Sequence, residues 1–199
     1  MAATVDYYLA LNSPWSYLGS ARLQEIAARH GATVRVKPVK LGEVFAKTGG
    51  TPLPQRPLER RNYRLLELER WSTHLGVPMV IQPRNFPSDE TTAAHMVIAA
   101  QEDGLDALGL ATALGRQLWE EDMSLADMDA LRATALLAGV DADHLLGAHP
   151  VQDLDAIHTR NTEDALAAGV FGVPSYVVNG EIFWGQDRLD FLDRKLAAP

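Results

Sequence analysis

Four residues near the start of the chain, Ser13-Pro14-Trp15-Ser16, place a hydroxyl where a short apolar run gives way to helical periodicity. Ser13 fits the N-cap of that helix and Pro14 its first position, where a missing N–H costs nothing. The simplest interpretation is a structural cap. The same geometry favours a bound anion, including a thiolate, because a helix N-terminus offers free N–H groups and partial positive charge. With no base adjacent, Ser13 suits a hydrogen-bond donor better than an acyl-transfer nucleophile.

A second candidate segment, Gly172-Val173-Pro174-Ser175, precedes a predicted hairpin. Proline is tolerated at the first residue of a strand, and the trans peptide bond is its ordinary state. A cis Val173-Pro174 bond would instead turn the Val173 backbone groups toward the mouth between the first strand and the first helix. The peptide backbone of a ligand could then pair with them as an added strand.

Two further groups of polar residues have both structural and ligand-binding interpretations. Asp187 fits the N-cap of the last helix, which is the common role of such a residue; alternatively, Asp187 and Gln186 hold the ammonium or amide end of a ligand. The charged segment 58–75 is mostly a solvated helix face with salt-bridge spacing. Some of its arginines, Arg60 among them, could still neutralise an acidic substrate.

Composition excludes several classes of function. The chain has no cysteine, so a dithiol redox reaction and thiolate zinc sites are excluded, and its six histidines show no metal-binding spacing, so no metal site is expected. A net charge of −8 disfavours nucleic acid as a partner. The start, MAATVDYYLAL, lacks signal-peptide features, and no apolar run approaches the roughly 18 residues of a membrane span. We expect a soluble, cytoplasmic protein without a membrane partner.

The elements that position these residues follow from periodicity. The 199 residues, 47% of them apolar, indicate one domain or one domain with an insertion. An apolar strand over 5–11, a helix over 15–30 and an alternating strand over 33–39 predict a parallel β-α-β unit. Pro38 favours a sheet edge or strand end for the second strand.

The rest of the chain is predicted to be helical until its last thirty or so residues. Helices are expected near 58–75, 89–101, 105–119, 128–137 and 152–168. Strands over 175–178 and 181–184 flank Asn179-Gly180, the dipeptide of a type I′ hairpin, and a helix over 187–196 ends the chain. The helical block of roughly 120 residues is too long for a loop, so it is expected to be an inserted domain.

Three motifs in this order resemble those of a known family. SPWSYLG at 13–19, GVPS at 172–175 and WGQDRL at 184–189 are similar to the 2-hydroxychromene-2-carboxylate isomerases, relatives of kappa-class glutathione transferases and of the DsbA group. The similarity runs nearly end to end. It implies a thioredoxin-like α/β fold with a large all-helical insertion: a thioredoxin-like domain over 1–42 and 169–199, an inserted helical domain over 43–168, and an active cleft between them.

The resemblance also implies glutathione as the cofactor. Ser13 stands where redox relatives carry a cysteine, and by this resemblance it contacts the glutathione sulfur. The other implied contacts are Trp15 beside the thiol, the Val173 backbone on the cysteinyl unit before a cis Pro174, and Gln186 with Asp187 at the γ-glutamyl end.

The implied reaction interconverts a hydroxychromene carboxylate and a benzylidenepyruvate by reversible thiolate addition, as part of aromatic compound catabolism. Arg60 or another arginine of the insertion would receive the carboxylate of this small aromatic substrate, and the relatives imply a homodimer. A kappa-like glutathione transferase and a non-catalytic thiol- or peptide-binding module are alternatives. Ala10 and Gly50 favour the module, because relatives carry Asp and Asn there.

Overall fold

A mixed four-stranded sheet forms the centre of the computed structural model, which describes residues 2–198. Its strand order is β2-β1-β3-β4, with β1 at Thr4–Leu9, β2 at Thr33–Pro38, β3 at Ser175–Val178 and β4 at Glu181–Trp184. β1 runs parallel to β2 and antiparallel to β3, and β3 is antiparallel to β4. The predicted β-α-β unit and hairpin are therefore confirmed, and Pro38 ends the edge strand β2.

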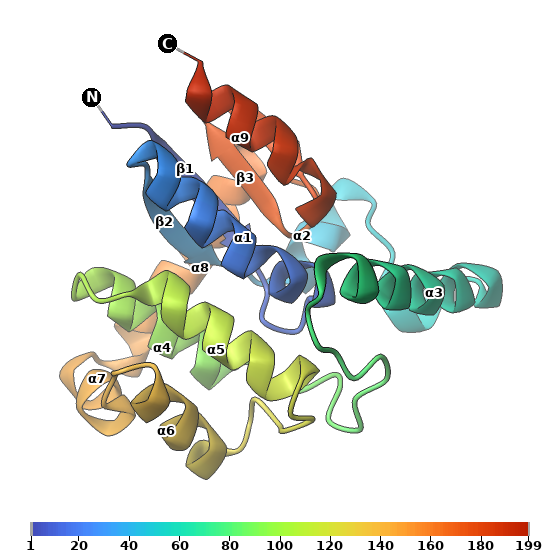
Figure 1. Ribbon diagram of the computed structural model, residues 1–199. Coiled ribbons are helices and arrows are strands. Elements are labelled where there is room, and N and C mark those ends of the chain that lie inside the picture. Colours follow the sequence, from blue (N-terminus) through green and yellow to red (C-terminus); the bar gives the residue numbers. More distant parts are fainter. Residues whose placement is uncertain (1, 199) are drawn as a thin grey trace.

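Helices follow β1, fill the chain between β2 and β3, and follow β4 (Figure 1). They are α1 (Pro14–His30), α2 (Leu41–Thr48), η1 (Leu53–Gln55), α3 (Leu58–Leu75), α4 (Thr91–Glu102), α5 (Ala107–Trp119), α6 (Met128–Leu137), α7 (Ala142–Ala148), α8 (Val151–Ala167), η2 (Gln186–Arg188) and α9 (Leu189–Ala197). The five helices predicted between the strand pairs lie within two residues of α3, α4, α5, α6 and α8. The short helices α2 and α7 were missed, because 8 and 7 residues hold too few apolar repeats to show a period. No helix over residues 2–198 is both long and apolar enough to cross a bilayer.

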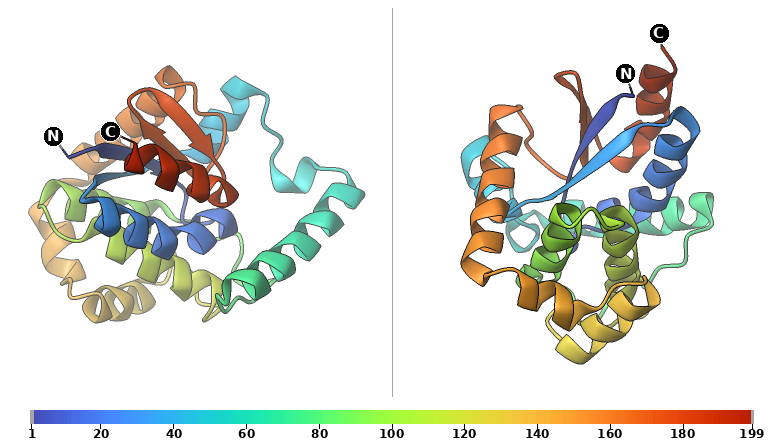
Figure 2. Two further views of the ribbon diagram at one scale, coloured as in Figure 1. Left: turned by 45° about the horizontal axis from the view of Figure 1, so that its top comes forward. Right: turned by 90° about the vertical axis from the view of Figure 1, so that its left-hand side faces the viewer.

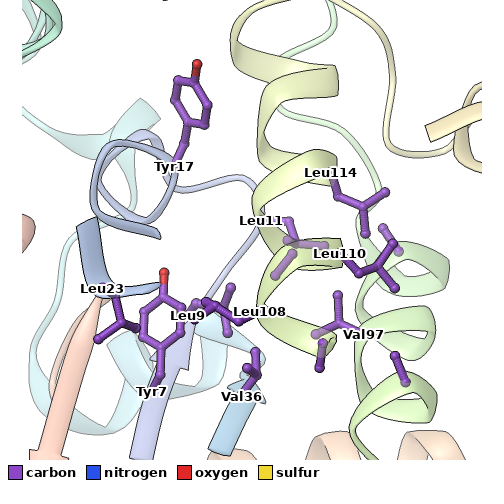
Figure 3. Close-up of a cluster of buried hydrophobic side chains, with 14 of the residues drawn as sticks. Tyr7, Leu9, Leu11, Tyr17, Leu23, Val36, Val97, Leu108, Leu110 and Leu114 are labelled. Carbon is purple, nitrogen blue, oxygen red and sulfur yellow. The ribbon is translucent and has the colours of Figure 1, made fainter. Parts of the chain in front are cut away.

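The hydrophobic core runs without a break from the sheet into the helical block. Figure 3 shows Leu9 of β1 and Val36 of β2 meeting Leu108 and Leu110 of α5 and Val97 of α4. All five side chains belong to one buried cluster. The helical segment is thus an insertion in chain order, while its apolar face packs against the sheet and α1.

Two local features shape the β3–β4 turn and the packing of β3 and η2 against α1. Asn179 and Gly180 have φ values of 51° and 81°, so both central residues of the β3–β4 turn are left-handed, as a type I′ turn requires. Gly19 of α1 lets η2 and β3 come close, because a Cβ there would lie 2.6 Å from the Tyr176 hydroxyl and 3.0 Å from Cβ of Gln186.

The first half of α3 extends away from the rest of the molecule (Figure 2). Within this helix only Leu68 is buried, whereas Leu58, Tyr63 and Leu66 are exposed. The predicted solvated face of this segment is confirmed. Its arginines differ in whether their side chains contact the rest of the protein.

Candidate active site

Ser13 caps the N-terminus of α1, as predicted. Its backbone is extended (φ −83°, ψ 116°), its Oγ accepts from the Ser16 amide at 3.3 Å, and Pro14 occupies the first helical position. Because the hydroxyl oxygen acts as the acceptor in this bond, the hydroxyl proton can still be donated. No acidic side chain lies in the first turn, and the amide of Trp15 has no acceptor within the helix. This end of α1 is therefore polarised to attract an anion.

The loop that enters α1 is held by residues far away in the sequence. The Asn12 amide donates to Oε2 of Glu90 at 2.6 Å, while Asn12 and Ser88 exchange two hydrogen bonds of 2.8 and 3.0 Å. Burial raises the pKa of Glu90 to about 6, although the Asn12 donors favour its charged form. Sequence reasoning missed Glu90, because the 78 residues between it and Asn12 leave no local pattern.

The Val173-Pro174 peptide bond is cis, as the resemblance implied. Val173 packs with Ala10 in a small apolar cluster beyond the Tyr8–Ser175 pair of the β1–β3 ladder. The Pro174 carbonyl accepts from Gly185, whereas the N–H and C=O of Val173 take no hydrogen-bond partner within residues 2–198. An unpaired backbone edge thus lies beside the strand end that leads to Ser13.

The segment after β4 departs in part from expectation. Gln186 is 1% exposed and its Oε1 accepts from Arg22 at 3.1 Å, so its amide end ties η2 to α1. The N-cap interpretation of Asp187 is wrong: Gly185 precedes η2, Arg188 precedes α9, and neither helix has a side-chain cap. The irregular turn through Gly185 (φ 105°) starts the helical chain earlier than the sequence suggested. Asp187 instead pairs with Arg188 at 2.7 Å on the surface. Because an exposed ion pair is weak, a cationic group of a ligand could replace Arg188 at this carboxylate.

The Ser13 side chain is largely buried. Ser13 is 6% exposed, and Trp15 beside it is partly buried against the core. Two surface hollows lie elsewhere, one bordered by Gln24 and Val34, the other by Phe183 and Arg188.

Three arginines, Arg56, Arg60 and Arg64, form a cationic group at the start of α3, here called the arginine cluster. Within residues 2–198, none of the three has a carboxylate oxygen within 4.0 Å. The Arg64 guanidinium lies 5.4 Å from the ring centroid of Phe86 and 5.9 Å from that of Trp119. Burial, with a smaller contribution from Arg56, lowers the pKa of Arg64 to about 10.

An arginine that is largely removed from water and lacks an acid partner is costly, so the cluster favours binding of an anion. Arg60, named from the sequence, is exposed on the outer part of α3, while Arg64 one turn later reaches the body of the protein. The i, i+4 spacing of these two residues is the signal that links them in the sequence.

Gly50 cannot accept a side chain as the structure stands. A Cβ there would collide with the ring of Phe45. The asparagine that the resemblance leads one to expect at this position would require Phe45 to move. Any contact between this loop and a ligand is therefore made by the backbone of Gly49-Gly50 or by Phe45.

Comparison with known proteins supports both the fold and the resemblance. The profile of DSBA-like thioredoxin domains matches residues 4–197. The 2-hydroxychromene-2-carboxylate isomerase of Sphingobium xenophagum is 29% identical over 197 residues, covering 98% of this chain and 99% of that protein. The enzyme of the same name from Pseudomonas putida is 28% identical over 194 residues, covering 95% and 92%.

Among solved structures, a 2-hydroxychromene-2-carboxylate isomerase matches with a TM-score of 0.78 and 27% identity, covering 98% of this chain and 94% of that one. The cytosolic disulfide reductase DsbM from Pseudomonas aeruginosa with GSH matches with a TM-score of 0.69 at 17% identity, covering 98% and 100%. The latter likeness concerns the fold alone. Together these matches confirm the thioredoxin-like fold and the similarity to the isomerases.

Proposed function

The chain belongs to the family of DSBA-like thioredoxin domains, and from this premise we propose that it is a glutathione-dependent isomerase of the 2-hydroxychromene-2-carboxylate isomerase type. The observation that carries the proposal is the Ser13 hydroxyl at the N-terminus of α1, in a chain without cysteine. A thioredoxin-like site that lacks its own thiol has to use a borrowed one. Two isomerases that are similar along nearly the whole chain suggest the reaction class.

The residues present fit a bound glutathione at two points. The unpaired N–H and C=O of Val173 can receive a peptide backbone as an added strand. The polarised end of α1 can hold a negative sulfur. When bound, glutathione would supply a thiolate for reversible addition to a conjugated substrate. The Gln186 side chain contributes less than the resemblance implied, because Arg22 already occupies its oxygen.

Ser13 would lower the pKa of the bound thiol. Its hydroxyl would donate to the sulfur, and Trp15 would present a free backbone amide from the same turn, because the Ser16 amide is already bonded to Ser13 Oγ. Asp187 at the surface would hold the γ-glutamyl ammonium in place of Arg188. Trp15, which packs against the core beside Ser13, would contact the thiol. These residues orient a nucleophile and keep it charged without changing their own covalent structure.

Arg64 receives the substrate carboxylate. Of the cluster, Arg64 is the half-buried arginine that contacts the body of the protein and has no acid partner, so an incoming carboxylate would supply the missing counter-charge. Phe86 and Trp119 keep the guanidinium in place by stacking. The substrate is then an aromatic keto acid or its cyclic hemiketal.

The test is interconversion of the hydroxychromene carboxylate and the benzylidenepyruvate with and without glutathione. We expect turnover only with glutathione and a fall in kcat of about 100-fold in Ser13→Ala, the usual cost of losing one donor to a developing anion. The control is Ser16→Ala, since the buried Ser16 hydroxyl in the same turn has no hydrogen-bond partner to lose.

Unchanged activity in Ser13→Ala would remove this serine from the mechanism. A stable adduct with a general electrophile, but no reaction with the chromene, would identify a glutathione transferase instead. Calorimetric binding of glutathione without turnover of either substrate would identify a thiol-binding module.

A further inference from the structure

We propose that His95, Asp155 and His158 form a binding site for one divalent transition-metal ion, separate from the Ser13 site. One potential ligand atom from each of these residues lies within 4.8 Å of the others. His95 comes from α4, while Asp155 and His158 come from α8. The ion would link these two helices on the far side of β2 from β1, where both helices contact that strand.

The two histidines are the main reason for proposing a ligand here. Each is 5% exposed, and Nε2 of His95 and both ring nitrogens of His158 have no hydrogen-bond partner. Buried polar atoms are normally satisfied, and leaving one unpaired costs about 1–3 kcal/mol. An ion held by one nitrogen of each ring would satisfy Nε2 of His95 and one of the two unpaired nitrogens of His158.

The spacing of the three residues suits one ion. Asp155 and His158 are three apart on α8 and so share a helix face. Nε2 of His95 lies 3.9 Å from Oδ1 of Asp155. Donors at 2.0–2.1 Å from a tetrahedral ion are about 3.3 Å apart, so side-chain shifts on the order of 1 Å close the site. Two imidazoles and one carboxylate, with water in a fourth position, suit Zn²⁺ or Co²⁺.

Lys40 would compete with the ion for Asp155, and this competition gives the proposal a further test. Its ammonium lies 3.0 Å from Oδ1 of Asp155 and donates to Thr159 at 2.9 Å. Asp155 is half exposed, so the carboxylate can exchange the lysine for an ion from the solvent side. Lys40 and the metal therefore compete for the same oxygen. Removing the ammonium should strengthen metal binding, because it removes both the competitor and a like charge.

The experiment titrates chelator-treated protein with Co²⁺, followed by visible absorption, and with Zn²⁺, followed by calorimetry. We expect one ion per chain and binding at least about 100-fold weaker in His95→Gln and in His158→Gln, since each removes a ligand. Lys40→Met should bind more tightly than wild type. Zn²⁺ should also raise the Tm of the wild type and not of the histidine variants.

The control is His149→Gln, because His149 pairs with Asp103 alone at 3.0 Å and lies outside the cluster. Its affinity should equal that of the wild type. If a buried variant fails to fold, Asp155→Asn at its exposed position provides the same test. The absence of stoichiometric binding, binding unaffected by Asp155→Asn, or weaker binding in Lys40→Met would each overturn the proposal. Since neither readout involves turnover, failure of the isomerase proposal leaves this result unaffected.

Discussion

A serine hydroxyl cannot be oxidised to a disulfide, so the residue at the tip of α1 can only orient and stabilise what another molecule brings. Ser13 has its oxygen engaged by the Ser16 amide and its proton free, which is the arrangement of a donor. At the scale of single residues, two ionisable side chains give tests of the site. These are Arg64, which the proposed function places at the substrate carboxylate, and the partly buried Glu90, which accepts from Asn12 in the loop before Ser13.

Arg64 and Arg60 provide a direct comparison on one helix. Arg64→Gln should raise KM for the aromatic acid by about tenfold or more with a smaller change in kcat, because a charge-assisted hydrogen bond contributes about 1.5–3 kcal/mol. Arg60→Gln, at an exposed position, should stay within about twofold of wild type in KM, because an exposed charge contributes little. Steady-state kinetics of the two variants checks this. A larger effect in Arg60→Gln would return the carboxylate to the residue first named from the sequence.

Glu90 should make stability depend on pH. Its pKa of about 6 in the folded protein lies above the ordinary 4.5, so the native state binds more protons than the unfolded state between these values. The contribution of Glu90 to the free energy of unfolding therefore falls as pH rises from about 4 to 6.5, by about 2 kcal/mol. Glu90→Gln should lack this fall. Urea unfolding of both proteins across this range measures the difference.

The control for this prediction lies at the other end of the same helix. Glu102 is an exposed glutamate at the end of α4. Glu102→Gln, measured over the same pH range, is the reference for removing one glutamate from this helix. If Glu90→Gln keeps a constant difference from wild type, Glu90 does not titrate as described.

At the scale of elements, the site exists because α1, β3 and η2 come close together. Gly19 permits this approach, since an added Cβ would lie 2.6 Å from the Tyr176 hydroxyl. Gly19→Ala should therefore lower the free energy of unfolding by about 1–3 kcal/mol through overpacking. Gly147→Ala in α7 meets nothing within 4 Å and should instead stabilise by up to about 1 kcal/mol. Thermal or urea unfolding would contradict this account if both substitutions had the same sign.

At the scale of the whole molecule, the shared core predicts that the sheet and the helical block unfold as one cooperative unit. Leu114 of α5 is fully buried in the cluster that also contains Leu9 of β1. Leu114→Ala should cost about 2–5 kcal/mol. Hydrogen exchange measured by mass spectrometry should show this loss in β1 as well as in α5, because both lie in one cooperative unit. Faster exchange confined to 43–168 would indicate that the insertion is a separate folding unit after all.

The sequence was sufficient to predict elements that depend on residues close together in the chain. The cap at Ser13, the edge position of Pro38 and the turn at Asn179-Gly180 each depend on residues within four positions of one another. Local backbone preferences and apolar periodicity act at this range, and they were sufficient for the β-α-β unit, the hairpin and the long helices. The resemblance to a family then placed these elements in a thioredoxin-like order.

Only the tertiary structure decided which distant residues meet. The bond from Asn12 to Glu90 spans 78 residues, and the one from Arg22 to Gln186 spans 164. The approach of His95 to His158 likewise depends on how α4 packs against α8. The physical reason is that periodicity reports the face a helix buries, while the partner of that face depends on the packing of the whole core.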